Sequence, residues 1–157
     1  MYKKSILEVA KDMKIQNASI LVTGATGLIG SCIIDVLIEA NTKLGKNIKI
    51  YALSRSYKGI VERFGDAVIP VIQDINFPLD GKIQFDYIIH GASNADPKSY
   101  ALQPVETILT NIVGNKNVLE YCSKHLNTKM ILTSTFEVYG EIKGQSTYTE
   151  DMSGIID

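Results

Sequence analysis

The sequence has few cysteines, no long apolar run and almost no net charge, and each absence excludes a class of protein. Cys32 and Cys122 stand in apolar segments without metal-type spacing, so we expect buried thiols and no metal site. No apolar run approaches the roughly 18–20 residues that span a bilayer, and residues 1–17 lack the apolar core of a signal peptide. The net charge of −1 favours neither nucleic acid nor acidic lipid as a partner. A reducing cytoplasm fits all of these features.

What is present is typical of one globular domain. The chain has 157 residues, of which 45% are hydrophobic and 21% charged. We therefore predict a single domain over residues 1–157, with a lead-in amphipathic helix in 1–17 and mostly loop in 134–157.

Short apolar runs alternate with amphipathic stretches along the chain. We expect strands at 19–23, 48–53, 67–72, 85–89 and 129–133, and helices at 30–40 and 104–124. Residues 97–100 predict a helical turn, and 56–64 either a short helix or a loop. This alternation predicts an α/β fold, a doubly wound (Rossmann-type) parallel sheet of about five strands with helices on both faces.

Two finer expectations concern orientation within this fold. Pro70 cannot donate a backbone hydrogen bond, so the strand at 67–72 should lie at an edge of the sheet. On the helix at 104–124 we expect an inward-facing apolar side made of Val105, Ile108, Leu109, Ile112, Leu119 and Cys122.

A glycine-rich turn follows the first expected strand. Gly24, Gly27 and Gly30 stand at spacing three between an apolar run and an amphipathic segment. Gly24 permits a sharp turn, Gly27 leaves room for a pyrophosphate, and Gly30 lets the helix pack close to the strand. A strand before the turn and a helix after it are the context that dinucleotide binding requires. The alternative is a tight turn with no ligand.

The ends of the second and third strands bear on the choice of cofactor. No acid stands in 52–56 to bind a ribose 2′-hydroxyl, whereas Arg55, next to Ser54, can donate charge-assisted hydrogen bonds to a 2′-phosphate. This favours NADP over NAD, with a solvated arginine as the alternative. Asp74 could accept a hydrogen bond from an adenine amino group, or be an ordinary loop acid.

Small and hydroxyl-bearing residues follow the last two expected strands. In His90-Gly91-Ala92-Ser93, the small residues let the backbone approach a ligand, and His90 fits a structural histidine better than a base. In the run 133–140, the hydroxyls of Ser134 and Thr135 lie where such folds hold substrates, and Glu137 could act as an acid or base. Taken alone, this second run would be an ordinary polar loop.

Taken together, these motifs resemble a known family. The chain is similar to the N-terminal portion of the extended short-chain dehydrogenase/reductases, the NAD-dependent epimerase/dehydratase group that acts on nucleotide sugars. The stretches that carry the resemblance are 23–30, 90–93, 110–119 and 134–140.

The resemblance implies a role for each matching position. With the residues above, the expected NAD(P)-binding set is Gly24, Thr26, Gly27, Leu28, Ile29, Gly30, Ser54, Arg55, Asp74, Ile75, Gly91, Ala92 and Ser93. Ser134 and Thr135 would bind the substrate. Thr135, with Glu137, would be catalytic, its hydroxyl bonding to the sugar 4-hydroxyl or ketone.

The chain departs from the family pattern in two places. Phe136 stands where dehydratases carry an acid, so the run is nearer to the decarboxylases and epimerases. The family's Tyr-x-x-x-Lys pair is expected about 25–30 residues after Thr135, beyond Asp157. Tyr148 is followed at i+4 by Met152 and is no substitute. We therefore expect this pair and the sugar-binding part to lie outside the chain, and the chain alone to be inactive.

Three functions remain open at this point. The first is the NAD(P)-binding portion of a nucleotide-sugar epimerase, dehydratase or decarboxylase that works through a 4-keto-sugar intermediate, with a homodimer as an open assembly. The second is a non-catalytic NAD(P)-binding sensor or docking module. The third is an NADP-dependent carbonyl reductase.

Overall fold

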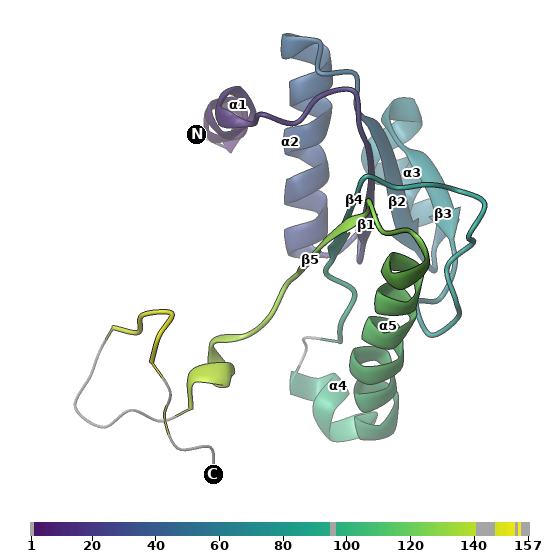
Figure 1. Ribbon diagram of the computed structural model, residues 1–157, viewed down its shortest axis with the longest axis vertical. Helices are drawn as coiled ribbons and strands as arrows, with labels where there is room; N and C mark the ends of the chain where they lie inside the picture. The colour runs from purple at the N-terminus through teal and green to yellow at the C-terminus, as the bar shows by residue number, and fades with distance from the viewer. Residues whose placement is uncertain (1, 95–96, 141–146, 153, 155–157) are drawn as a thin grey trace.

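The computed structural model describes residues 2–94, 97–140, 147–152 and 154, and its core is one parallel sheet (Figure 1). The strands are β1 (Ser19–Thr23), β2 (Lys49–Ser54), β3 (Ile69–Ile72), β4 (Tyr87–His90) and β5 (Lys129–Leu132), in the order β3-β2-β1-β4-β5. Every neighbouring pair is parallel. From β1 the chain continues outward to β2 and β3, and then returns to the other side of β1 to form β4 and β5. A ligand-binding crevice is expected at this change of direction, between the segments that leave the carboxyl ends of β1 and β4.

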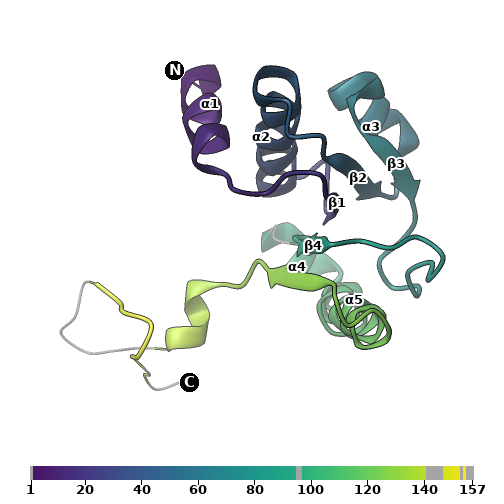
Figure 2. The ribbon, with the colours of Figure 1, turned by 45° about the horizontal axis from the view of Figure 1, so that its top comes forward.

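Helices cover both faces of the sheet (Figure 2). On one face lie α1 (Tyr2–Asp12), α2 (Leu28–Leu44) and α3 (Tyr57–Phe64), and on the other α4 (Pro97–Leu102) and α5 (Pro104–Lys124). Two 3₁₀ turns, η1 (Gly65–Ala67) and η2 (Phe136–Tyr139), complete the list of described elements. The predicted doubly wound α/β fold is thus confirmed.

Two apolar clusters flank the sheet. Ile20, Ile34 and Ile50 belong to the cluster under α2 and α3, whereas Leu21 and Val118 belong to the one under α5. Successive side chains of a strand point to opposite faces, so β1 supplies both clusters and is buried on both sides. This burial agrees with the unbroken apolar run in its sequence.

The predicted element boundaries are close to the observed ones, with informative exceptions. The second helix starts at Leu28, two residues early, and continues to Leu44, where Gly45 ends it at φ 61°. The open choice at 56–64 resolves to a helix, because the Ser56 hydroxyl caps it by accepting from the Gly59 N–H at 3.0 Å. Pro70 lies in β3, an edge strand, as predicted.

The inward face of α5 is not the predicted one. Val105, Ile108, Leu109, Ile112 and Leu119 are 45–64% exposed, and only Cys122 of that set packs against the core. The buried side instead carries Thr107, Gly114, Asn117, Val118 and Tyr121. A glycine and an asparagine allow the helix to lie close against the loop after β3, so the most apolar side of the helix is left uncovered within the described residues.

The two thiols and the C-terminal region also differ from expectation. Cys32 is exposed on α2 and Cys122 is half-buried, so the predicted pair of buried thiols is wrong for Cys32. After β5 the chain leads away from the sheet (Figure 1). η2 is the only helical segment among the described residues of 134–157. Residues 141–146, 153 and 155–157 of the predicted loop lie outside the described residues. None of the described helices has the length and apolarity to cross a bilayer.

Candidate functional site

A cavity of about 240 Å³ lies at the carboxyl ends of the central strands. Every predicted cofactor residue lines it except Leu28, Ile29 and Gly30. Four lining residues were missed from sequence: Leu53, Gln73, Asn94 and Thr110. Leu53, Gln73 and Asn94 each adjoin a predicted position after a strand, a signal that could have found them. Thr110 reaches the cavity from α5, and its signal was its place in the 110–119 stretch of the family resemblance.

The glycine turn forms one wall of this cavity. Gly24 has φ 66°, a left-handed conformation that favours glycine, and its carbonyl accepts from the Gly27 N–H at 2.9 Å. A Cβ added at Gly24 would lie 2.6 Å from the carbonyl oxygen of Gly91. Gly30 is buried against the Gly24 carbonyl, where a side chain would not fit. Gly30 therefore lets α2 pack on the turn and does not face the cavity.

The start of α2 opens beside the turn. Gly27 is the N-cap residue, with extended backbone, and no side chain caps the helix. The first N–H groups of an α-helix lack intrahelical partners and carry partial positive charge. Leu28 is 88% exposed and Ile29 57% exposed, so their side chains do not cover this end. The arrangement suits an anion such as a pyrophosphate.

The β2 end of the cavity carries hydroxyls and one cation. The hydroxyls of Thr26 and Ser54 lie 3.4 Å apart, and the Ser54 hydroxyl also accepts from the Ser56 N–H at 3.2 Å. Arg55 is exposed and makes no hydrogen bond or ion pair within the part of the chain that the structure describes. Asp74, the one acid of the lining, accepts from the Asn76 N–H at 2.9 Å.

Two α5 residues without a predicted role hold the Ile75 side of the cavity. The Asn117 amide is buried and donates to the Ile75 carbonyl at 2.8 Å. A Cβ at Gly114 would come within 3.1 Å of the Ile75 side chain, so glycine gives Ile75 its space. A glycine and an asparagine three residues apart on a helix were the available sequence signal.

Replacing Asn117 with alanine is expected to loosen this wall. The Ile75 carbonyl would lose a buried hydrogen bond, which costs about 1–3 kcal/mol in the free energy of unfolding. Urea unfolding measures that loss, and titration with AMP should show weaker binding. Leu119→Ala on the exposed side of α5 is the matched control, with an expected change below about 0.5 kcal/mol. Equal stability of the two variants would contradict the role given to Asn117.

His90 ends β4, directly before the residues Gly91–Ser93 that line the cavity. The residue is buried, and its Nδ1 lies 2.7 Å from the Thr23 hydroxyl oxygen. Burial lowers the pKa of His90, because the charged imidazolium loses solvation. A neutral, hydrogen-bonded histidine fits the structural role expected from the sequence.

The residues predicted to meet a substrate lie apart from this cavity. Ser134, Thr135 and Glu137 are all exposed, and none of them lines it. The Thr135 hydroxyl accepts from the Glu137 N–H at 3.3 Å and so caps η2. The described residues supply no further wall around these side chains, and their catalytic roles stay predictions.

Tyr139 and Lys143 also have Tyr-x-x-x-Lys spacing, although they follow Thr135 by only four and eight residues. Residues four apart meet on a continuous helix. Here η2 ends at Tyr139, and Gly140 follows at φ 66°. Lys143 lies outside the described residues. Because the helical turn ends at Tyr139, the structure does not favour this pair as a catalytic one.

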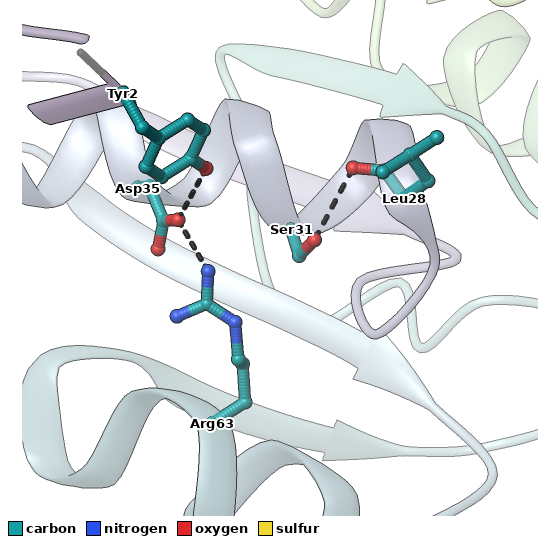
Figure 3. Close-up of polar contacts among 5 residues, drawn as sticks. All are labelled: Tyr2, Leu28, Ser31, Asp35 and Arg63. Carbon is teal, nitrogen blue, oxygen red and sulfur yellow. Dashed lines mark hydrogen bonds and ion pairs between the residues drawn. The ribbon is translucent and has the colours of Figure 1, made fainter.

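Outside the cavity, α2 is tied to both neighbouring helices by one carboxylate (Figure 3). The Tyr2 hydroxyl donates to Asp35 at 2.7 Å, and Arg63 of α3 pairs with the same carboxylate oxygen. The hydrogen bond to Asp35 raises the pKa of Tyr2 to about 12, so the phenol remains a donor. In the first turn of α2, the Ser31 hydroxyl donates to the Leu28 carbonyl at 3.2 Å. These contacts hold α2, and hence its open N-terminus, in place.

The strand order, the glycine turn and a cavity at the switch point define a Rossmann-type domain. A family model described as NAD dependent epimerase/dehydratase family matches residues 20–154. The chain belongs to this family of enzymes.

The chain is similar to known proteins that are considerably longer than it is. UDP-glucuronic acid decarboxylase 3 of Arabidopsis thaliana is 36% identical over 126 residues, which cover 80% of this chain and 36% of that protein. UDP-N-acetylglucosamine 4-epimerase from Methanobrevibacter ruminantium M1 has a TM-score of 0.73 and 23% identity, over 90% of this chain and 45% of its own. UDP-glucose 4-epimerase from Bifidobacterium longum, solved with NAD⁺ and UDP, has a TM-score of 0.66 and 24% identity, over 85% of this chain and 41% of its own. These two structures show the shared fold, and the chain spans less than half of each protein's length.

Proposed function

We propose that this chain binds an NAD(P) dinucleotide and forms the cofactor-binding portion of a nucleotide-sugar epimerase or decarboxylase. The observation that carries the proposal is the uncapped N-terminus of α2, opening beside Gly27 at the cavity. Backbone N–H groups and the helix dipole together stabilise a pyrophosphate there. The Bifidobacterium longum epimerase of the same fold was solved with NAD⁺, which supports the class of ligand.

The lining gives each part of the dinucleotide a place. The adenosine would lie toward Asp74 and Ile75, beyond β2, and the nicotinamide toward Gly91, after β4, on either side of the switch point. When bound, the nicotinamide supplies hydride transfer to and from the sugar. The chain's own residues would bind and orient it, with Gly91, Ala92 and Ser93 beside the nicotinamide.

NADP is the preferred cofactor in this proposal. The 2′-position of the adenine ribose falls near the end of β2, where Thr26 and Ser54 offer hydroxyls and Arg55 a cation with no partner among the described residues. A 2′-phosphate would pair with Arg55, and no acid at the end of β2 would repel it.

The substrate of the whole enzyme is proposed to be a nucleotide sugar. The Arabidopsis relative is named for UDP-glucuronic acid and the two epimerases for UDP sugars, which supports this class. Ser134 and Thr135 would bind the sugar, and Glu137 would exchange a proton with it. A second copy of the chain on the apolar side of α5 would give a homodimer, and the cytoplasm remains the proposed compartment.

We further propose that these 157 residues alone bind the cofactor without turning over substrate. Within the described residues, Thr135 and Glu137 are exposed and away from the cavity, and the helical turn η2 ends at Tyr139. The sensor or docking module is the second candidate, because the cavity needs none of these three residues. Assay of the chain with UDP sugars tests both candidates together, because turnover would contradict the predicted inactivity and the sensor alike.

Calorimetric titration with NAD⁺ and NADP⁺, in parallel, tests the cofactor proposal. The expected result is binding of both, with tighter binding of NADP⁺. ADP-ribose, which lacks the nicotinamide, should still bind through the pyrophosphate and adenosine. Absence of binding by all three ligands would overturn the assignment of the cavity.

A further inference from the structure

One side-chain oxygen, Oγ1 of Thr23, receives three contacts at the junction of β1 and β4. The N–H groups of Gly91 and Ala92 donate to it at 3.2 and 3.1 Å. Its third contact is His90 Nδ1 at 2.7 Å, and both side chains are buried. Water therefore has little access to this junction, and these polar groups must find their hydrogen-bond partners among themselves.

Counting protons at this oxygen determines the state of His90. A threonine hydroxyl has two acceptor positions and one proton. The Ala92 N–H occupies one acceptor position, and the Gly91 N–H, which it shares with the Thr23 carbonyl oxygen at 3.3 Å, occupies the other. Among the described residues, His90 Nδ1 is the remaining partner of this oxygen, so the hydroxyl proton points at it. That nitrogen is then an acceptor without a proton, and a neutral ring carries its proton on Nε2. The lowered pKa of the buried ring agrees with a neutral imidazole.

The same segment is held from the β5 side. The backbone N–H and the hydroxyl of Thr133 both donate to the His90 carbonyl at 3.0 Å. The Gly91 carbonyl oxygen, in turn, lies only 2.6 Å from the position that a Cβ on Gly24 would take. The conformation of residues 90–92 is thus coupled to the glycine turn on one side and to the end of β5 on the other.

We propose that Thr23 and His90 are positioning residues for the dinucleotide, acting as a hydroxyl–imidazole clamp that sets the Gly91–Ala92 backbone. The clamp turns both N–H groups inward to Thr23, so that Gly91 and Ala92 present a smooth, side-chain-poor surface to the nicotinamide half of the cofactor. Neither side chain is among the residues that line the cavity, so each acts through the backbone. This inference rests on the proposed dinucleotide binding.

Nitrogen NMR of the wild-type chain tests the proton arrangement without any ligand. The two ring nitrogens of His90, assigned with a His90→Asn variant, should show a protonated Nε2 and an unprotonated Nδ1 at neutral pH. A proton on Nδ1, or a charged ring, would overturn the clamp whatever the chain binds.

Titration of Thr23→Val and Thr23→Ser with NAD⁺, NADP⁺ and AMP tests the positioning role. Valine keeps the shape and removes the hydroxyl, so the Kd for both dinucleotides should rise about tenfold, as for one lost hydrogen bond. AMP, which does not reach Gly91, should bind unchanged, and serine should restore dinucleotide binding. If Thr23→Val melts earlier but binds dinucleotides as the wild type does, the clamp is only structural and the proposal fails. If the wild type binds no dinucleotide, the proposed function fails, while the NMR result still stands.

Discussion

Replacing Gly24 with alanine is expected to weaken dinucleotide binding at least about 100-fold, or more than 2.7 kcal/mol. Gly24 has φ 66°, where a side chain costs about 1–2 kcal/mol. The added Cβ would also lie 2.6 Å from the Gly91 carbonyl oxygen and 2.9 Å from the Ala92 nitrogen. Both obstacles are backbone atoms, so β1 and β4 must separate at the point where Gly24 and Gly91 face the cavity. Calorimetry with NADP⁺ measures the loss, and circular dichroism checks that the variant is folded.

Gly45→Ala is the matched control for this substitution. Gly45 has φ 61°, and an added Cβ would meet no atom within 4 Å. It therefore carries the left-handed strain without the collision, at the end of α2 farthest from the cavity. This variant should lose about 1 kcal/mol of stability and bind the cofactor like the wild type. Gly24→Ala binding within threefold of the wild type would show that the close approach of the two strands is not needed.

Replacing Arg55 with alanine is expected to raise the Kd for NADP⁺ about 10- to 100-fold and to change the Kd for NAD⁺ less than about threefold. Hydrogen bonds to charged groups contribute about 1.5–3 kcal/mol, and only NADP⁺ carries the 2′-phosphate that Arg55 would pair with. The structure favours this outcome because Arg55 lines the cavity and has no partner among the described residues. Parallel calorimetric titrations with the two cofactors measure the difference.

Lys58→Ala serves as the control for overall charge. Lys58 lies on the neighbouring α3, its side chain is 82% exposed, and it pairs with Glu62. Its removal takes away the same unit of charge without touching the cavity, so both cofactors should bind as before at 0.15 M salt. Equal losses of NAD⁺ and NADP⁺ affinity in Arg55→Ala would refute the preference for NADP.

The turn at 23–30 illustrates what local chemistry predicts well. An unbroken apolar run specifies a strand buried on both sides, and glycines at spacing three specify a sharp exit followed by a closely packed helix. These preferences act over a few residues and agree with one another. The observed β1, the left-handed Gly24 and the buried Gly30 follow them directly.

Helix α5 illustrates what local chemistry does not predict. Its bounds, Pro104–Lys124, match the prediction because proline is favoured in a first helical turn. Its orientation does not match, since the Gly114 and Asn117 side packs on the Ile75 loop and the most apolar side stays exposed. Periodicity shows that a helix has an apolar side, but the shape of the surface it meets decides which side is buried.

By itself, the sequence determined the class of fold, the glycine turn and the likeness to the NAD-dependent epimerase/dehydratase family, because these depend on short-range patterns and motif order. Only the tertiary structure decided which strand ends become neighbours. Thr23 and His90 are 67 residues apart, and their contact exists because β4 pairs with β1 in register, placing Thr23 opposite His90. No local pattern encodes that pairing, so the Thr23–His90 contact and the Asn117–Ile75 hydrogen bond became visible only in the folded chain.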